Sequence, residues 1–478
     1  MTVQSNAVRG SLQGTVCPGP DLACDVIDHH LRLFGIRECA PLVWHRADES
    51  AVAGARAACA AGQIAVVLDP DPGFCSALGA SVQDTVAAAG DVLACPAAAG
   101  RSWERLRTLH LVRGFMHPDG VPVVNATASP AAAWLWVPHG RSGVLLVGTD
   151  LAADLIRYRQ GDPSRALDRP ADAFWGIPGE RPNYLFERQL TGEDPHDRPA
   201  DWWAMALATT LERLGGLKRS PILPGDAPGA IVITGDDDQA RLSHYSMQLA
   251  ALGDLPITYF LHPLTKHTPA SMAELFAHQR VDLGLHPDAL ETPERYGSLL
   301  VEQAAWYRSL TGNSPQSVRN HGFLNDGYWG HLPHWRAQGI QISSNIPGVD
   351  GRVVNGSLLP ARMAWDGTLT EHWSVLTAIG DGVVFALRFT TEQSAACIHG
   401  LADKIRSSGV PGLIVLNLHP DNIESTLAMH HAAREVASNG FLPWSMRDCL
   451  EWCESIEGRA GKARNAPGTG GRSCAVAS

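Results

Sequence analysis

Residues 230–420 contain a series of short apolar, β-branched runs, and each is followed within two residues by a histidine or a carboxylate. The runs are AIVIT (230–234), PITYFL (256–261), VDLGL (281–285) and GLIVLNL (412–418). Runs of this length and composition are typical of buried strands, and segments long enough to form helices lie between them. The pattern predicts an α/β fold whose parallel strands present polar side chains at their carboxyl ends.

Three consecutive carboxylates, Asp236, Asp237 and Asp238, follow the first run. Adjacent negative charges repel one another, and a folded protein tolerates them where a cation lies among them. The alternative is an acidic helix start, because aspartate is favoured at N-caps and in the first helical turn. Spacing alone does not decide between a cation site and a capped helix.

Histidines occupy the positions after the other runs: His262, His286 and His419. A further segment, SVRNHG, brings His321 close to Arg319. A single histidine after a strand is usually a hydrogen-bonded edge residue. Several of them behind a carboxylate cluster indicate one shared site, because the carboxyl ends of parallel strands meet at the same edge of a barrel.

The order of these segments resembles the polysaccharide deacetylase domain, carbohydrate esterase family 4. The motifs that resemble that family are ITGDDD, PITYFL, DLGLH, VRNHGF and IVLNLHP, over about residues 220–450. The resemblance implies a distorted (β/α) barrel that uses a divalent metal, expected to be Zn²⁺, to hydrolyse N-acyl amides. The expected substrate is a soluble N-acylated sugar or a biosynthetic intermediate.

The resemblance also implies roles for individual residues. Asp236 would be the general base that deprotonates water held by the metal, and Arg319 would orient this carboxylate. Asp237 and His286 would be metal ligands, and His419 would be the general acid that protonates the leaving amine. These roles agree with metal-assisted hydrolysis, in which the ion activates water and polarises the carbonyl while side chains move protons.

The sequence departs from the family at two positions. Leu290 stands where the family has a second metal histidine, and His321 stands where it has a proline. We expect these changes to compensate each other, so that the metal ligands are Asp237, His286 and His321. Two histidines and a carboxylate leave coordination positions open for water and substrate. The rival third ligands are Asp288, Asp238 and His262.

Residues 1–200 are expected to form an additional α/β domain that is flavodoxin-like or amidotransferase-like. Strand-like runs at 63–68, 131–137 and 143–148 and a helix over 151–159 favour a parallel, doubly wound sheet. The region contains no Gly-x-Cys-x-Gly nucleophile motif, so it is expected to be structural or substrate-shaping. Residues 220–456 would form the barrel, and residues 457–478 lack periodicity and are expected to be a disordered tail.

Composition limits the partners. The net charge is −11 and only 18% of residues are charged, which argues against nucleic acid as the main partner. The longest apolar runs are far shorter than a membrane span, and residues 1–20 lack the apolar core of a secretory leader. A cytoplasmic enzyme acting on a small N-acylated molecule is therefore expected, and its oligomeric state is left open.

Two other functions stay open from the sequence. One is hydrolysis of a non-sugar amide, a cyclic imide or a ureide. The other is a catalytically inactive carbohydrate-binding protein. Five aromatic residues near the motifs are expected either to stack on a sugar or to pack in the core: Tyr328, Trp329, Trp335, Trp365 and Trp373.

Overall fold

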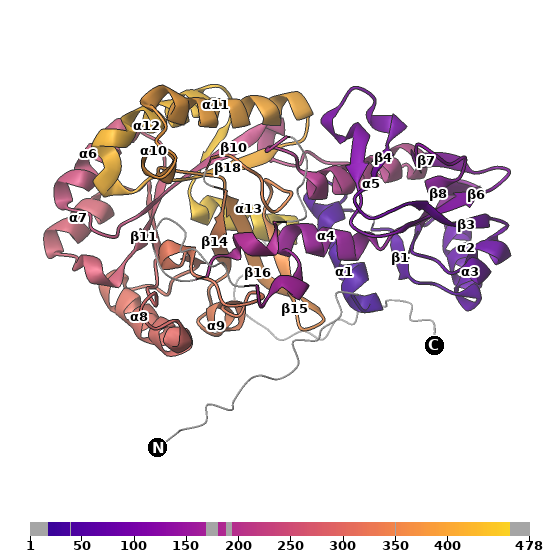
Figure 1. Cartoon of the computed structure of the whole chain (residues 1–478), viewed down its shortest axis with the longest axis horizontal. Helices are drawn as coiled ribbons and strands as arrows, with labels where there is room; N and C mark the ends of the chain where they lie inside the picture. The colour runs from indigo at the N-terminus through magenta and orange to yellow at the C-terminus, as the bar shows by residue number, and fades with distance from the viewer. Residues whose placement is uncertain (1–17, 39, 169–179, 188–193, 349, 459–478) are drawn as a thin grey trace, which may run out of the picture.

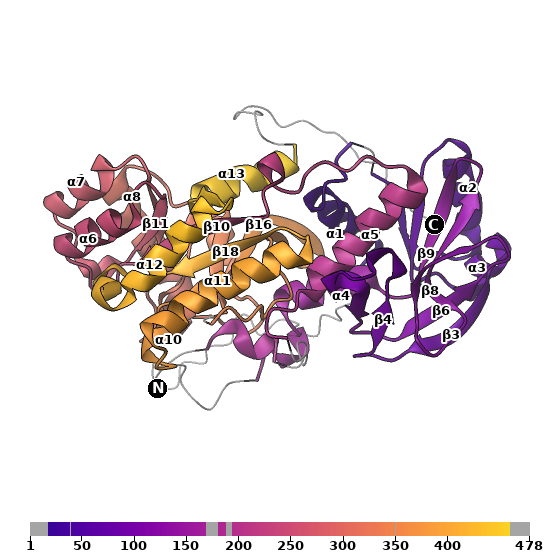
Figure 2. The ribbon, with the colours of Figure 1, turned by 90° about the horizontal axis from the view of Figure 1, so that it is seen from above.

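The computed structural model describes residues 18–38, 40–168, 180–187, 194–348 and 350–458. Figures 1 and 2 show two regions side by side along the long axis, each built on its own sheet. The first sheet ends at Val147, and the second begins at Gly229. Within the described residues, no helix has the length and apolar character needed to cross a membrane.

The amino-terminal sheet is mixed. Its strands are β1 Leu42–His45, β2 Ala65–Leu68, β3 Ser81–Ala87, β4 Val92–Ala94, β5 Arg105–Arg107, β6 Val112–Met116, β7 Val121–Asn125, β8 Ala132–His139 and β9 Ser142–Val147. Its associated helices are α1 Pro20–Leu33, α2 Val52–Ala60, α3 Pro72–Leu78, α4 Leu151–Gln160 and α5 Pro199–Gly215. The predicted strands and the helix over 151–159 are therefore present.

The order of the strands differs from a doubly wound sheet. Only β1, β2 and β9 pair in parallel, and the other pairs are antiparallel. The reason is the length of the connections. Only Gly140 and Arg141 separate β8 from β9, whereas a parallel crossover needs a dozen or more residues. Gly140 has a φ of 64°, which suits a tight hairpin turn.

The second sheet is parallel apart from its edge strand β15. Its strands are β10 Gly229–Asp236, β11 Ile257–Leu261, β12 Val281–Leu285, β13 Ser317–Val318, β14 Ile342–Pro347, β15 Ala361–Trp365, β16 Thr368–Thr377, β17 Ile379–Gly380, β18 Gly412–Asn417 and β19 Leu442–Trp444. The helices of this region are α6 Leu242–Leu252, α7 Pro269–Ala277, α8 Tyr296–Thr311, α9 Leu332–Ala337, α10 Gly382–Phe385, α11 Thr391–Ser408, α12 Ile423–Ser438 and α13 Met446–Ile456.

This sheet closes into a ring through β16 and β17, which only Ala378 separates. At the end of β16, Thr377 pairs with Pro347 of β14, and in β17 Ile379 pairs with Leu416 of β18. Because β18 pairs with β10, and β10 leads through β11, β12 and β13 to β14, the ring is complete. The predicted distorted (β/α) barrel is thus confirmed, and all strand exits of the ring lie at one end.

The two regions share one hydrophobic core. Trp134 and Trp203 of the first region belong to the same buried cluster as Trp373 and Val415 of the barrel. Helices α1 and α4 pack against β16 and β15 respectively, and Figure 2 shows α1, α4 and α5 between the two sheets. The shared core fixes how the amino-terminal region sits against the barrel.

A partly buried carboxylate, Glu457, also links α1 to the barrel region. The backbone N–H of Arg362 donates to His29 Nε2 at 3.2 Å, so the neutral ring carries its proton on Nδ1 and donates it to Glu457 Oε1 at 2.9 Å. Burial raises the pKa of Glu457, but the hydrogen bond from His29 and the nearby guanidinium charges lower it to about 2. Glu457 and Gly458 are the only described residues of the predicted tail, 457–478, whose remainder lies outside the described residues.

Glu457→Gln is expected to destabilise the protein by about 2–3 kcal/mol at pH 7. The pKa of Glu457 is depressed in the folded state, so its stabilisation is complete above the ordinary value of 4.5 and is lost as the pH falls to about 2. Urea unfolding of the wild type and of Glu457→Gln should therefore give free energies of unfolding whose difference shrinks as the pH falls over this range. Glu451→Gln, at an exposed position of α13, is the control, and a difference that does not change with pH would contradict the prediction.

Candidate active site

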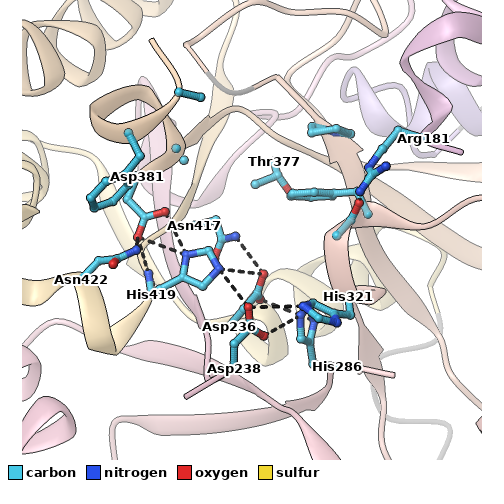
Figure 3. Close-up of a pocket in the computed structure, with 17 residues that line it drawn as sticks. Arg181, Asp236, Asp238, His286, His321, Thr377, Asp381, Asn417, His419 and Asn422 are labelled. Atoms are coloured by element: carbon cyan, nitrogen blue, oxygen red, sulfur yellow. Dashed lines mark hydrogen bonds and ion pairs between the residues drawn. The ribbon is translucent and has the colours of Figure 1, made fainter. Parts of the chain in front are cut away.

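A cavity of about 500 Å³ lies at the carboxyl ends of the barrel strands. Figure 3 shows that Asp236, Asp238, His286, His321 and His419 face this cavity together. They come from the exits of β10, β12, β13 and β18, which are parallel and end at the same edge. Apart from Asp237, the structure therefore brings the predicted ligand and proton-transfer residues to one place.

Gly235 allows two of these exits to lie close together. A Cβ atom at Gly235 would lie 2.6 Å from the carbonyl oxygen of Leu418, which a side chain would have to displace. The backbone of β18 consequently runs tightly against β10, with the Leu418 N–H bonded to the carbonyl of Thr234. This close approach sets Asp236 beside His419, whose Nε2 lies 3.9 Å from Asp236 Oδ2.

Asp236 is a buried carboxylate with a fixed orientation. Arg319 Nη1 donates to Oδ1 at 2.8 Å, and Asn417 Nδ2 donates to Oδ2 at 2.8 Å. Burial by itself raises the pKa of Asp236, but the Arg319 guanidinium and two nearby histidine rings outweigh it and lower the pKa. The carboxylate is therefore charged at neutral pH. The predicted contact between Arg319 and Asp236 is present.

Arg319 is fully buried and held on all sides. Its guanidinium donates to the hydroxyls of Thr234, Ser344 and Thr377 and to the carbonyl oxygen of Ser344. The same guanidinium lies over the Phe260 ring, 4.6 Å from its centroid. These contacts satisfy the donors of a buried cation, so Arg319 acts as a rigid support for Asp236.

Asp238, His286 and His321 form a group that could hold a metal ion, because their ligand atoms lie within 4.8 Å of one another. Asp238 Oδ1 is 3.2 Å from His286 Nε2, and Asp238 Oδ2 is 3.6 Å from His321 Nε2. His286 Nδ1 donates to the carbonyl oxygen of Arg319 at 2.6 Å, so the lone pair of the neutral ring is on Nε2.

The atoms of this group suit a divalent cation. In the described part of the chain, Asp238 Oδ1 and His286 Nε2 are buried and have no hydrogen-bond partner. Such groups are costly unless a ligand satisfies them. Asp238 and Asp288 overcome the effect of burial and raise the pKa of His321 to about 9, which reflects surroundings arranged for positive charge. Two imidazole nitrogens and a carboxylate oxygen are a donor set that Zn²⁺ prefers.

Asp237 does not join this group, contrary to the expected triad of Asp237, His286 and His321. Its carboxylate turns away from the cavity, toward His267 Nε2 at 2.7 Å and the Tyr245 hydroxyl at 3.2 Å. It also accepts the backbone N–H of His262. Asp237 is fully buried and connects the segments that follow β10 and β11, and Asp238 takes its place at the cavity.

His419 is paired with Asp381, a residue that the sequence reasoning missed. His419 Nδ1 lies 2.9 Å from Asp381 Oδ1, and the backbone N–H of His419 donates to Oδ2 at 2.8 Å. Burial opposes a charge on the ring, but Asp381 overcomes this and raises the pKa of His419 to about 10. The sequence contained one indication of Asp381. Ile379-Gly380-Asp381 ends an apolar run with a glycine and an aspartate, as Thr234-Gly235-Asp236 does.

The two other rival ligands form a neighbouring group with His321. His262 Nε2 lies 3.6 Å from Asp288 Oδ2, and His321 Nδ1 lies 3.2 Å from Asp288 Oδ1. Leu290 contributes only its backbone to this region, where its N–H donates to Asp288 Oδ1 at 3.0 Å. The position that lacks the expected second histidine therefore supports Asp288.

The five aromatic residues considered for sugar stacking do not line the cavity. Trp329, Trp335 and Trp373 are buried, and Tyr328 and Trp365 are partly buried against the barrel core. The aromatic side chains at the cavity are Phe323, which follows His321, and Phe385 of α10, which is 53% exposed. Of the two alternatives for the five residues, core packing is the one observed.

No protein-family model and no curated protein matches the sequence. Similar solved structures include a protein assigned as a polysaccharide deacetylase from Mycobacterium smegmatis, at 15% identity and a TM-score of 0.39 over 52% of this chain and 96% of that one. A chitin deacetylase from Colletotrichum lindemuthianum has 14% identity and a TM-score of 0.33, over 48% and 91%. A peptidoglycan deacetylase from Bacillus subtilis has 12% identity and a TM-score of 0.32, over 48% and 94%. These three structures are described as a polysaccharide, a chitin and a peptidoglycan deacetylase, and the similarity covers about half of this chain.

Proposed function

We propose that this protein is a metal-dependent hydrolase that removes the acyl group from the amide nitrogen of a small N-acylated molecule. One observation is the main support: a metal-ligand group, a charged carboxylate and a histidine–carboxylate pair lie together in one cavity (Figure 3). The carboxylate is Asp236, the pair is His419 with Asp381, and the ligand group is Asp238, His286 and His321. Amide hydrolysis requires a base, an acid and a stabilised carbonyl oxygen in this arrangement.

A divalent ion held by Asp238, His286 and His321 would polarise the amide carbonyl and make an attacking water more acidic. Asp236 accepts the proton of the water, and Arg319 and Asn417 hold the carboxylate in place for this step. His419 is protonated at neutral pH and donates its Nε2 proton to the departing nitrogen. Asp381 holds Nδ1 and stabilises the imidazolium before the transfer.

The dimensions of the cavity favour a small substrate. A volume of about 500 Å³ lies within the range of small-molecule sites. Arg181, from a segment outside the barrel, lines the cavity and donates to the carbonyl oxygen of Gly322 at 2.7 Å. This segment covers one side of the strand exits. An N-acylated sugar or a biosynthetic intermediate fits such a site better than a long polymer.

The test combines metal analysis with product analysis on the purified chain. We expect about one Zn²⁺ per chain, and release of acetate from N-acetylated amino sugars that stops when a chelator removes the metal. Ring opening of cyclic imides or ureides without acetate release would favour the non-sugar amide alternative. A chain that binds sugars but holds no divalent metal would contradict the proposal and favour a binding protein.

Asp381→Asn is expected to lower kcat by about 100-fold with little change in KM. An amide in place of the carboxylate removes the negative charge that raises the pKa of His419, so less of the acid form is present at neutral pH. Steady-state kinetics at pH 7 measure the effect. Asp403→Asn is the control, because Asp403 is an exposed carboxylate of α11 that pairs only at the surface with Arg406. Equal kcat values for the two variants would contradict the role of Asp381 in keeping His419 protonated.

A further inference from the structure

We propose that Asp288 and His262 are positioning residues that hold His321 as a metal ligand through its Nε2 atom. This inference rests on the metal site of the proposed function and concerns residues that lie outside the ligand group. A backbone group that donates to or accepts from a histidine ring shows which ring nitrogen carries the proton. Backbone N–H groups can only donate, and carbonyl oxygens can only accept.

His262 has a defined tautomer. The backbone N–H of Leu264 donates to His262 Nδ1 at 3.2 Å, so Nδ1 supplies a lone pair and the proton of the neutral ring is on Nε2. This Nε2–H is buried and lies 3.6 Å from Asp288 Oδ2. His262 therefore presents a donor to Asp288. It does not present the free lone pair that a metal ligand needs.

Asp288 lies between His262 and His321 and has a fixed backbone. Its N–H donates to Gln303 Oε1 at 2.8 Å, and Gln303 Nε2 donates back to its carbonyl oxygen at 2.7 Å. Gln303 belongs to α8, so this helix anchors the segment after β12. The Leu290 N–H occupies one lone pair of Oδ1, and His321 Nδ1 lies 3.2 Å from the same atom.

These contacts determine which nitrogen of His321 faces the cavity. Asp288 Oδ1 lies 3.2 Å from Nδ1 and favours a proton there, so an ion that displaces the other ring proton binds at Nε2, which faces Asp238 at 3.6 Å. A carboxylate behind a ligating histidine fixes the orientation of the ring and makes the ligand more basic. His286 needs no carboxylate, because the carbonyl oxygen of Arg319 has the same role for its Nδ1.

A second metal ion is the competing explanation. His262, Asp288 and His321 also have ligand atoms within 4.8 Å of one another. An ion there would need a lone pair on His262 Nε2. That nitrogen bears a proton while the Leu264 N–H donates to Nδ1. It would also need both nitrogens of His321 to be deprotonated if the first group were filled. The hydrogen bond from the Leu264 N–H to His262 Nδ1 thus favours one ion with a supporting pair.

The experiment measures metal binding directly, on the full chain. Zn²⁺ affinity is determined by competition with a chelator, stoichiometry by metal analysis, and ligand geometry by the absorption spectrum of the Co²⁺ form. Asp288→Asn removes the charge, and His262→Asn removes Nε2–H while keeping a side chain that can accept the Leu264 N–H. Asp69→Asn is the matched control, because Asp69 is as exposed as Asp288 (22% and 21%) and is ion-paired far from the site, in the amino-terminal region.

We expect one ion per chain in every variant, a dissociation constant raised by about 10- to 100-fold in Asp288→Asn, and a smaller rise in His262→Asn. The Co²⁺ spectrum should change in both variants and stay unchanged in Asp69→Asn. Unchanged affinity in Asp288→Asn would overturn the inference, as would two ions per chain falling to one in either variant. A wild-type chain that binds neither Zn²⁺ nor Co²⁺ would instead overturn the proposed function itself.

Discussion

Asp236→Asn is expected to reduce amide hydrolysis by about 100- to 10,000-fold, the range typical of a lost general base. An amide nitrogen cannot accept the proton of the attacking water at neutral pH. The shape of the side chain is retained, and Arg319 can still donate to the remaining oxygen. Asn417 Oδ1 has no hydrogen-bond partner among the described residues, so its amide can turn to accept from the new amide group.

The measurement is kcat/KM for acetate release, together with metal content and the thermal unfolding of each variant. Asp282→Asn is the matched control, since Asp282 is also a buried carboxylate and pairs at 2.8 Å with Arg447, away from the cavity. We expect Asp236→Asn to keep its metal and Asp282→Asn to keep its activity. Full activity in Asp236→Asn would exclude this residue as the base.

Asp238→Asn is expected to weaken Zn²⁺ binding by at least about 100-fold, and His321→Ala is expected to do the same, because each removes one of three ligands. Asp237→Asn is the informative comparison, since it changes the neighbouring residue in the same way. The Asp237 carboxylate points to Tyr245 and His267, so its variant should keep the metal.

Metal content after dialysis and a chelator competition give the affinities of the three variants. The metal-free proteins should be compared by thermal unfolding, because Asp237 is buried and its replacement costs stability. Loss of metal from Asp237→Asn together with retention by Asp238→Asn would reverse the assignment of the ligand. Retention of metal by His321→Ala would show that the third ligand lies elsewhere.

Much of the site could be predicted from the sequence because it follows from strand ends. The runs before Asp236, His286 and His419 are strands β10, β12 and β18, and parallel strands in a barrel end at one edge. Any fold that makes these strands parallel brings the three side chains to the same region. The amino-terminal sheet was predicted less well, because its antiparallel pairs depend on short turns between the strands.

The sequence could not determine which of the consecutive carboxylates faces the cavity. Alternation along β10 ends at Asp236, and the directions of Asp237 and Asp238 depend on the groups that meet them in space. Tyr245 and His267 draw Asp237 away from the cavity, and they lie on segments whose packing no local pattern specifies. The expected triad contained Asp237 because the resemblance to the deacetylase motif implied it, whereas Asp238 is the carboxylate within reach of His286.

By itself, the sequence determined the α/β class, four strands of the barrel and a site at their ends, because these depend on local hydrophobic patterns and on the positions of polar residues after them. Only the tertiary structure decided the partners: Asp381 with His419, Asp288 with His321, and Asp238 in place of Asp237. Asp381 lies 38 positions before His419, and only the pairing of β17 with β18 brings the two together. Side-chain direction is set by long-range contacts, and those exist only once the barrel has closed.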